Sequence, residues 1–117
     1  MAAEKNNWIK IAEDISEIDF GDNNIAEREV GDKKICLGKF NDMIFAFAAV
    51  CPHAGGLLAD GCINASGHIV CPVHNYKFNM RSGHNVSGEG YHLKHWPVAI
   101  MADGVFVDMG KEELLRS

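Results

Sequence analysis

No part of this 117-residue sequence is long and apolar enough to cross a membrane, because a transmembrane helix needs roughly 20 consecutive apolar residues. The longest apolar run, Met43–Val50, has the length of a strand. The N-terminal residues MAAEKNNWIK also lack the apolar core of a signal peptide. We therefore expect a protein that is not secreted and that works in the cytoplasm.

Positive charge is also in short supply. The chain has 11 lysines and arginines against 16 aspartates and glutamates, which gives a formal net charge of −5. This balance disfavours nucleic acids and anionic membranes as partners and fits better with a basic patch on another protein. The hydrophobic content of 47% is ordinary for a globular protein. We expect one domain, residues 1–117, with a modest core.

Apolar residues do not recur at helical spacing anywhere over a long stretch, and short strands separated by turn residues are predicted instead. A single helical turn or a loop is expected at Ser16–Asp19, and the tail KEELLRS, residues 111–117, is the best helix candidate. Hairpin turns are predicted at Gly31-Asp32, Asn41-Asp42 and Ala102–Gly104. The predicted strands are Trp8–Glu13, Ala26–Gly31, Lys33–Phe40, Met43–Val50, Pro97–Met101 and Val105–Met109.

This pattern predicts an all-β fold, an antiparallel sandwich or small barrel. The segment Cys51–Gly90 is rich in Gly, His and Asn and has little strand character. We interpret it as loops mounted on the β frame, forming a subdomain of about residues 49–90, and loops on a rigid scaffold often carry function.

The cysteines are few, and two of them lie close to histidines. Cys51 is followed by His53 and Cys71 by His74, in the pattern C-x-H, 17 residues, C-x-x-H. A proline follows each of these cysteines directly, which restricts the loop at that point. This spacing indicates metal ligands instead of disulfides. The other two cysteines, Cys36 and Cys62, have no such partners, and we interpret them as small buried hydrophobic residues.

Two thiolates and two imidazoles suit either zinc or an iron–sulfur centre. The usual zinc finger groups its cysteines together and its histidines together. Here each loop supplies one of each, which favours a two-iron centre with both thiolates on one iron and both imidazoles on the other. A structural zinc site remains the alternative.

The stretches CPHAGGLL and CPVHNYKF resemble the Rieske iron–sulfur motif, most closely that of small Rieske-type ferredoxins and of the small subunit of assimilatory nitrite reductase. The resemblance implies the Rieske fold and one [2Fe–2S] cluster per chain. It assigns Cys51 and Cys71 to the inner iron and His53 and His74 to the outer, solvent-facing iron. It also implies that Leu58 helps to shield the cluster.

Several positions depart from other members of that family. Asn75 stands where glycine commonly follows the second histidine, and asparagine tolerates the left-handed conformation such a turn needs. High-potential members have a serine and a tyrosine where this chain has Tyr76 and Phe78. Those members also join their two loops by a disulfide, at positions held here by Gly56 and Val73. The resemblance therefore implies the low-potential branch, near about −150 mV.

The function implied is one-electron transfer from a flavin- or NAD(P)H-linked reductase to a terminal oxygenase or similar enzyme. The chain itself would not be an enzyme and has no catalytic residues, because nothing is left over to build a separate non-haem iron site. The alternative is a small subunit of an assimilatory nitrite reductase. We expect the electron to leave at the two histidine ligands, beside Leu57, Leu58 and Tyr76 as apolar contacts. The other histidines are interpreted as surface residues: His68, His84, His92 and His95.

Overall fold

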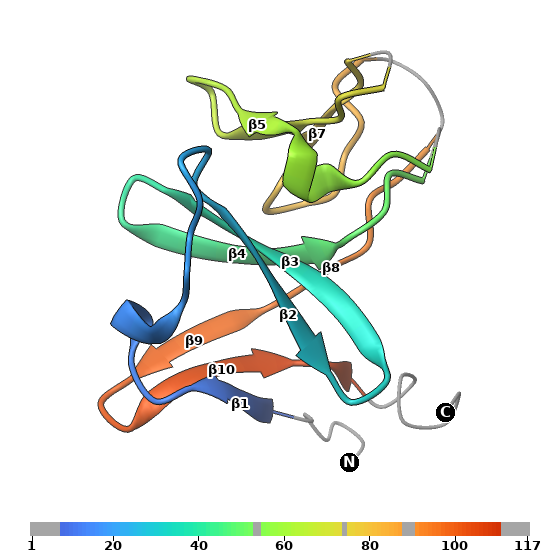
Figure 1. The fold of residues 1–117 in the computed structure, drawn as a ribbon. Coiled ribbons are helices and arrows are strands. Elements are labelled where there is room, and N and C mark those ends of the chain that lie inside the picture. Colours follow the sequence, from blue (N-terminus) through green and yellow to red (C-terminus); the bar gives the residue numbers. More distant parts are fainter. Residues whose placement is uncertain (1–7, 53–54, 74, 88–90, 111–117) are drawn as a thin grey trace.

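The protein is described by a computed structural model that covers residues 8–52, 55–73, 75–87 and 91–110. Short strands and two short 3₁₀ helices make up its regular structure (Figure 1). In chain order they are β1 Trp8–Ala12, η1 Ile15–Glu17, β2 Ile25–Val30, β3 Lys33–Phe40, β4 Met43–Ala48, η2 Leu58–Asp60, β5 Cys62–Ile63, β6 His68–Val70, β7 Lys77–Asn79, β8 His95–Trp96, β9 Val98–Met101 and β10 Gly104–Asp108.

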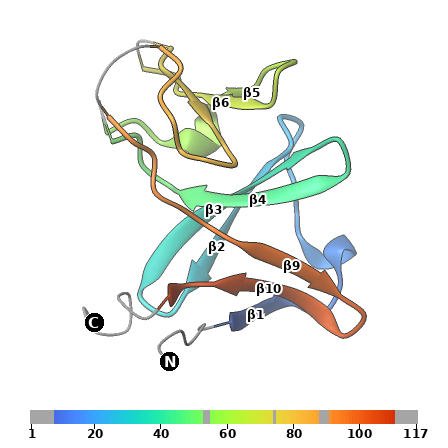
Figure 2. The ribbon, with the colours of Figure 1, turned by 180° about the vertical axis from the view of Figure 1, so that it is seen from behind.

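The strands form three antiparallel sheets, ordered β1-β10-β9, β2-β3-β4-β8 and β5-β6-β7. The two views in Figures 1 and 2 show the sheets stacked, with β2-β3-β4-β8 in the middle. The all-β antiparallel prediction is confirmed. The expectation of little strand character in Cys51–Gly90 is wrong, because β5, β6 and β7 lie there. Strands of two or three residues are too short to show an alternating pattern.

At the centre of β3, residues 35–38, the middle sheet is buried on both faces. Ile35 and Leu37 point into the core shared with the β1-β10-β9 sheet, while Cys36 points into the core shared with the loops and the third sheet. Gly38 lies against Met80, so even a methyl group there would meet the Met80 sulfur at 2.7 Å. Burial on both faces explains why the run Ile35–Gly38 is apolar without alternation.

Cys36 is buried, as the sequence predicted. Burial, with a smaller contribution from the Glu27 carboxylate, raises the pKa of its thiol to about 12. The thiol is therefore protonated and unreactive at neutral pH. Its role is packing between the middle sheet and the loops.

The predicted hairpin turns are present. Asn41 and Asp42 both have positive φ, 53° and 65°, between the paired residues Phe40 and Met43. Two positive φ values are typical of the type I′ turn that matches strand twist. The last hairpin is one residue tighter than predicted, because Gly104 already pairs with Met101.

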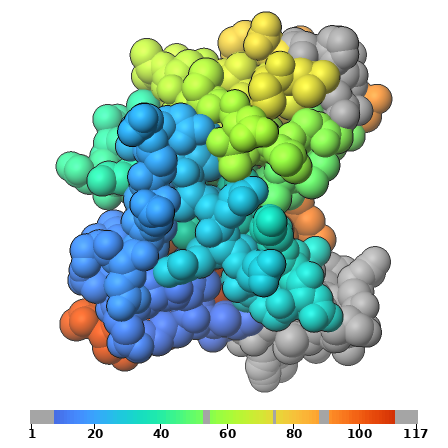
Figure 3. All heavy atoms as spheres, in the orientation of Figure 1, coloured from blue at the N-terminus to red at the C-terminus, as the bar shows by residue number. Residues whose placement is uncertain are grey.

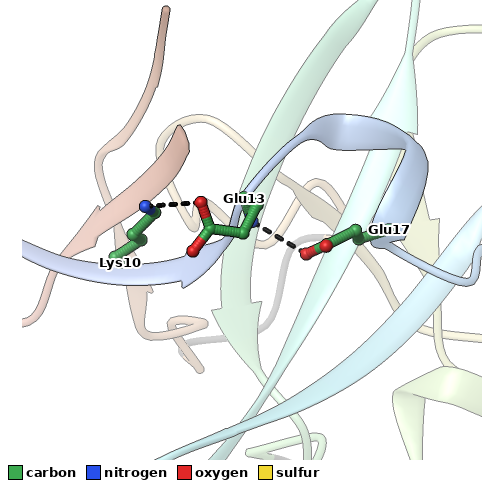
Figure 4. A network of polar contacts seen from close by, with 3 residues as sticks. All are labelled: Lys10, Glu13 and Glu17. Atoms are coloured by element: carbon green, nitrogen blue, oxygen red, sulfur yellow. Dashed lines mark hydrogen bonds and ion pairs between the residues drawn. The ribbon is translucent and has the colours of Figure 1, made fainter. Parts of the chain in front are cut away.

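The predicted helical turn near Ser16 exists as η1, but Asp14 caps it. The Asp14 carboxylate accepts hydrogen bonds from the N–H and the hydroxyl of Ser16, at 3.0 and 2.6 Å. Figure 4 shows the neighbouring network, in which Lys10 Nζ lies 2.8 Å from Glu13 Oε1 and the Glu13 N–H donates to Glu17 Oε1. These exposed contacts fix the end of β1 and contribute little stability. The tail at 111–117 lies outside the described residues. Among the residues that the structure describes, no helix is long and apolar enough to cross a membrane.

Two cores join the layers. In Figure 3 the green and yellow residues of the loop subdomain pack directly on the blue and cyan strands. The core beneath these loops contains Ile25, Cys36, Phe47, Ala49, Cys51, Leu58, Ile69, Cys71, Phe78, Met80 and Leu93. The two motif cysteines therefore belong to the same apolar cluster as the middle sheet, and the frame positions them directly.

Gly83 closes the subdomain, and we predict that Gly83→Ala is strongly destabilising. Its φ is +78°, and an added Cβ would overlap the Leu93 carbonyl oxygen and approach the His92 ring. Backbone strain and overlap together should cost roughly 2–5 kcal/mol. Thermal unfolding followed by far-UV circular dichroism should show a midpoint lowered by about 10 °C or more.

The matched control is Gly31→Ala in the β2–β3 turn. Gly31 also has positive φ, 63°, but nothing lies within 4 Å of the added Cβ. This variant should lose only about 1–2 kcal/mol from backbone strain. Equal midpoints for the two variants would contradict the packing assigned to Gly83.

Candidate metal centre

The two Cys–His loops share one backbone geometry. In each loop the cysteine N–H donates to the carbonyl oxygen five residues later, Cys51 to Gly56 and Cys71 to Tyr76, both at 2.8 Å. In each loop the residue four positions after the cysteine has positive φ, +73° at Gly55 and +57° at Asn75. The expectation that asparagine can replace glycine in this turn is confirmed.

The first loop is anchored to the frame on both sides. Val50 and Leu57 form a β-bridge, and the Leu58 N–H donates to the Ala49 carbonyl at 2.9 Å. The Asn23 side-chain amide, from the loop before β2, donates to the carbonyls of Ala59 and Gly61, both at 2.9 Å. The first loop therefore starts just after β4 and ends at η2, and hydrogen bonds hold both of its ends in place.

The second loop is anchored by the hairpin that follows it. Phe78 forms a β-bridge with Asn85, and the Lys77 N–H donates to the Ser87 hydroxyl at 2.9 Å. Phe78 is fully buried in the core beneath the loops. Residues 79–87 thus return along β7 and hold the loop from its far side.

The thiols of Cys51 and Cys71 are brought together in a buried place. Both cysteines are buried in the same apolar core, and neither takes part in a disulfide. Burial raises the pKa of the Cys71 thiol. The Val73 N–H, 3.4 Å from its sulfur, lowers this pKa, and the nearby Cys51 raises it further.

These thiols fit an iron–sulfur centre by the chemistry of their donor set. Two thiolates side by side in a buried site repel each other and lack water, so a bound cation is needed to stabilise them. Thiolate is the ligand that iron–sulfur clusters use, and a backbone N–H aimed at the sulfur is the kind of outer contact that tunes such clusters.

Close approach between the loops explains Gly56. A Cβ atom at this position would lie 3.0 Å from the Cys71 sulfur and 3.5 Å from the Val73 Cβ. The two positions that the resemblance associated with an interloop disulfide therefore face each other, although they are glycine and valine here. Because Gly56 has no side chain, the space next to the Cys71 thiol stays open.

Not every predicted site residue can be placed. His53 and His74 lie outside the described residues. Leu58 is fully buried, which fits a shielding role but makes it wrong as a surface contact. Cys62 is exposed, so its interpretation as a buried residue is wrong as well.

Sequence reasoning named Leu57 but missed the other exposed apolar side chains near the loops. Five apolar side chains there are more than one third exposed: Val50, Leu57, Val73, Val86 and Tyr91. We call this set the apolar collar. Val50, Leu57 and Val73 lie near the motif cysteines in the sequence, and this proximity is the feature that could have indicated them. The Tyr91 ring lies 6.4 Å from the Tyr76 ring, edge to face, which places it beside the second loop.

Comparison with known proteins agrees with this geometry. Residues 7–97 match the family described as the Rieske [2Fe-2S] domain. The chain belongs to the Rieske [2Fe–2S] domain family. The group that this domain binds is one [2Fe–2S] cluster, and the buried thiol pair fits it.

Three known proteins illustrate what this chain is similar to. The ferredoxin component of an alkene monooxygenase system from Xanthobacter autotrophicus is 26% identical over 86 residues, 74% of this chain and 69% of the relative. The ferredoxin of carbazole 1,9a-dioxygenase from Nocardioides aromaticivorans is 18% identical over 87% of this chain and 97% of its own, with a TM-score of 0.74. A structure described as an NADH-dependent nitrite reductase small subunit from Mycobacterium tuberculosis is 16% identical over 92% of this chain and 98% of its own, with a TM-score of 0.75.

The contact between the Rieske loops predicts that a disulfide can be introduced between them. In the double variant Gly56→Cys/Val73→Cys the two Cβ atoms would lie about 3.5 Å apart, within the usual range for a disulfide. Thiol titration of the oxidised variant should find two fewer free thiols than of the reduced variant. The visible absorbance of the cluster should then decay more slowly on heating, because the loops cannot separate.

The single variant Gly56→Cys is the control. It adds the same side chain beside the Cys71 sulfur without the crosslink, so it should keep all its thiols and gain no resistance to heating. A double variant with the full thiol count after oxidation would contradict the close approach of the two loops.

Proposed function

We propose that this chain is a one-electron carrier in which Cys51, His53, Cys71 and His74 hold the cluster. The observation that carries the proposal is the pair of buried thiols on two loops of the same geometry. When bound, the cluster supplies a one-electron redox couple. The chain contributes ligands, shielding and a surface for contact, and no catalytic residue is needed.

The residues around the thiols would exclude water from them and set the potential. Leu58 and Phe78 are fully buried in the core that contains both cysteines. Phe78 has no hydroxyl to donate, so the Val73 N–H is the described donor at the Cys71 sulfur. Fewer donors at the sulfurs leave added negative charge less stabilised, which supports a potential in the lower part of the Rieske range.

In this proposal the chain receives its electron from a flavin- or NAD(P)H-linked reductase. It passes the electron to the terminal component of an oxygenase system. The support is the alkene monooxygenase ferredoxin, a carrier similar in sequence over most of its length. The nitrite reductase small subunit has an equally similar fold, so the shape does not separate the two functions. We further propose that residues 1–117 work as one domain in the cytoplasm, where free thiols such as Cys62 persist.

The apolar collar is proposed as the contact surface for the electron acceptor. Val50 and Leu57 belong to the first cysteine loop, Val73 belongs to the second, and Val86 and Tyr91 belong to the segment that follows β7. Electron-transfer complexes are small and short-lived, often below about 1,200 Å² of buried surface. A few exposed apolar side chains are enough for such an interface.

The ligand assignment predicts that Cys71→Ser abolishes the cluster. A serine hydroxyl does not replace the thiolate at a buried iron, so the purified variant should be colourless. Iron and acid-labile sulfide analysis should fall from about two of each per chain to near zero. The wild-type protein and the variant Cys62→Ser should both retain the full content, since Cys62 is exposed on β5. Full cluster content in Cys71→Ser would contradict the assignment, and zinc with no visible absorbance in the wild type would favour the structural zinc site instead.

The collar predicts that Leu57→Asp slows electron transfer to the cognate acceptor about tenfold or more, without changing the spectrum or the potential. A charge at the centre of a small apolar interface must lose its water on contact. Stopped-flow reduction of the acceptor measures this rate. Ile100→Asp on β9 is the matched control, because Leu57 and Ile100 are both 51% exposed and both variants change the net charge equally. Equal transfer rates in the two variants would show that the electron leaves the protein at a surface other than the collar.

A further inference from the structure

Asn85 is a polar residue in an apolar place. Its exposed fraction is 2%, and within residues 8–52, 55–73, 75–87 and 91–110 it is the one buried residue with a polar or charged side chain. Its side-chain nitrogen Nδ2 is buried and has no hydrogen-bond partner in this part of the chain. A buried N–H without a partner gives up its hydrogen bonds to water and gains none in return, so a bound group that accepts from it would explain its presence.

The pairing of Asn85 turns its side chain toward the core that contains the motif cysteines. Asn85 forms a β-bridge with Phe78, and the two ladder hydrogen bonds on either side, both of 2.9 Å, join the neighbouring residues instead of this pair. In such a non-hydrogen-bonded antiparallel pair the two side chains lie on one face and close together. Phe78 is fully buried in the core with Cys51 and Cys71. The Asn85 side chain therefore enters that core beside the Phe78 ring.

The two ends of the Asn85 side-chain amide have different surroundings. Oδ1 accepts the N–H of Ser87, two residues later, at 2.8 Å. This contact identifies the oxygen, because Nδ2 in its place would face another donor. The contact also folds the amide toward Ser87, whose hydroxyl accepts the Lys77 N–H directly after the residue that closes the Cys71 loop. The amide thus lies at the end of the hairpin that is nearer to this loop.

The surroundings of Nδ2 narrow the choice of its partner. A buried water typically makes about three hydrogen bonds, whereas the buried side chains of this core offer sulfur atoms but no oxygen or nitrogen. The thiols of Cys51 and Cys71 do not accept from Nδ2. The [2Fe–2S] cluster of this family brings sulfide ions, which carry negative charge and accept hydrogen bonds.

We propose that Asn85 donates a hydrogen bond from Nδ2 to a sulfide of the bound cluster and thereby raises its potential. The inference rests on the proposed function and adds a side-chain donor to the Val73 N–H. Reduction adds one negative charge, and a buried donor stabilises the reduced form more than the oxidised form. Asn85 is then a residue that sets the potential, held in place by Phe78 and Ser87.

The test is the reduction potential of the holoprotein variant Asn85→Leu, measured by a spectroscopic redox titration. Leucine is similar in volume to asparagine, suits an apolar core and has no donor. The reduced cluster should become about tenfold less stable relative to the oxidised cluster, which for one electron is a potential about 59 mV lower. An unchanged or higher potential would overturn the proposal.

The matched control is Asn64→Leu in the turn between β5 and β6. Asn64 makes the same kind of local contact, since its Oδ1 accepts the N–H of Ser66, two residues later, at 3.0 Å. It lies outside the core that contains the cysteines. The control variant should therefore keep the wild-type potential. An equal decrease in both variants would overturn the proposal, because loss of the turn contact would then be the cause.

A second measurement does not depend on the folding of Asn85→Leu. The holoprotein is produced with ¹⁵N in its asparagine side-chain amides alone, and the reduced, paramagnetic cluster is studied by pulsed EPR. The background is Asn75→Gly, because Asn75 is the asparagine of the cluster loops and its φ of +57° suits glycine. We expect a weak coupling between the label and the cluster, and its absence would overturn the proposal.

Failure of the proposed function gives a different result. A protein that binds zinc without iron or sulfide would have neither a measurable potential nor an EPR signal, which would reject the electron carrier itself. Full iron and sulfide content with an unchanged potential in Asn85→Leu would overturn the role of Asn85 and leave the carrier function in place.

Discussion

The burial of the middle sheet on both faces is the constraint on which the rest of the structure depends. β3 alternates its side chains between two cores, Ile35 and Leu37 toward one and Cys36 toward the other. Because the second core also contains Cys51 and Cys71, the cluster ligands are packed into the same apolar contacts that hold the frame together. Any shift of β3 or β4 would move the thiols with it, so the position of the site is as well defined as the frame itself.

Much of this arrangement could be predicted from residue patterns, for reasons that particular elements make clear. The Asn41-Asp42 dipeptide tolerates positive φ at both positions, and it forms the expected hairpin turn. The paired Cys-Pro loops point to one metal centre, and their cysteines do meet. In both cases the local chemistry of a few residues is enough to determine the local structure.

The parts that could not be predicted depend on contacts between distant segments. Leu57 and Leu58 are identical in type and adjacent, yet one is half-exposed and the other fully buried, because the bridge to Val50 turns them to opposite sides. Cys36 and Cys62 look alike in sequence, but only Cys36 lies on a strand covered from both sides. The strands β5 to β7 are stabilised by pairing with one another. A strand of two residues is too short to give an alternating pattern of apolar and polar residues in the sequence.

The paired loops close through their own backbone. The bonds from Cys51 to Gly56 and from Cys71 to Tyr76 use only main-chain atoms, and the turns need only the left-handed residues Gly55 and Asn75. Side chains along the two loops can therefore vary without loss of these closing bonds, as long as the two left-handed positions keep residues that tolerate positive φ.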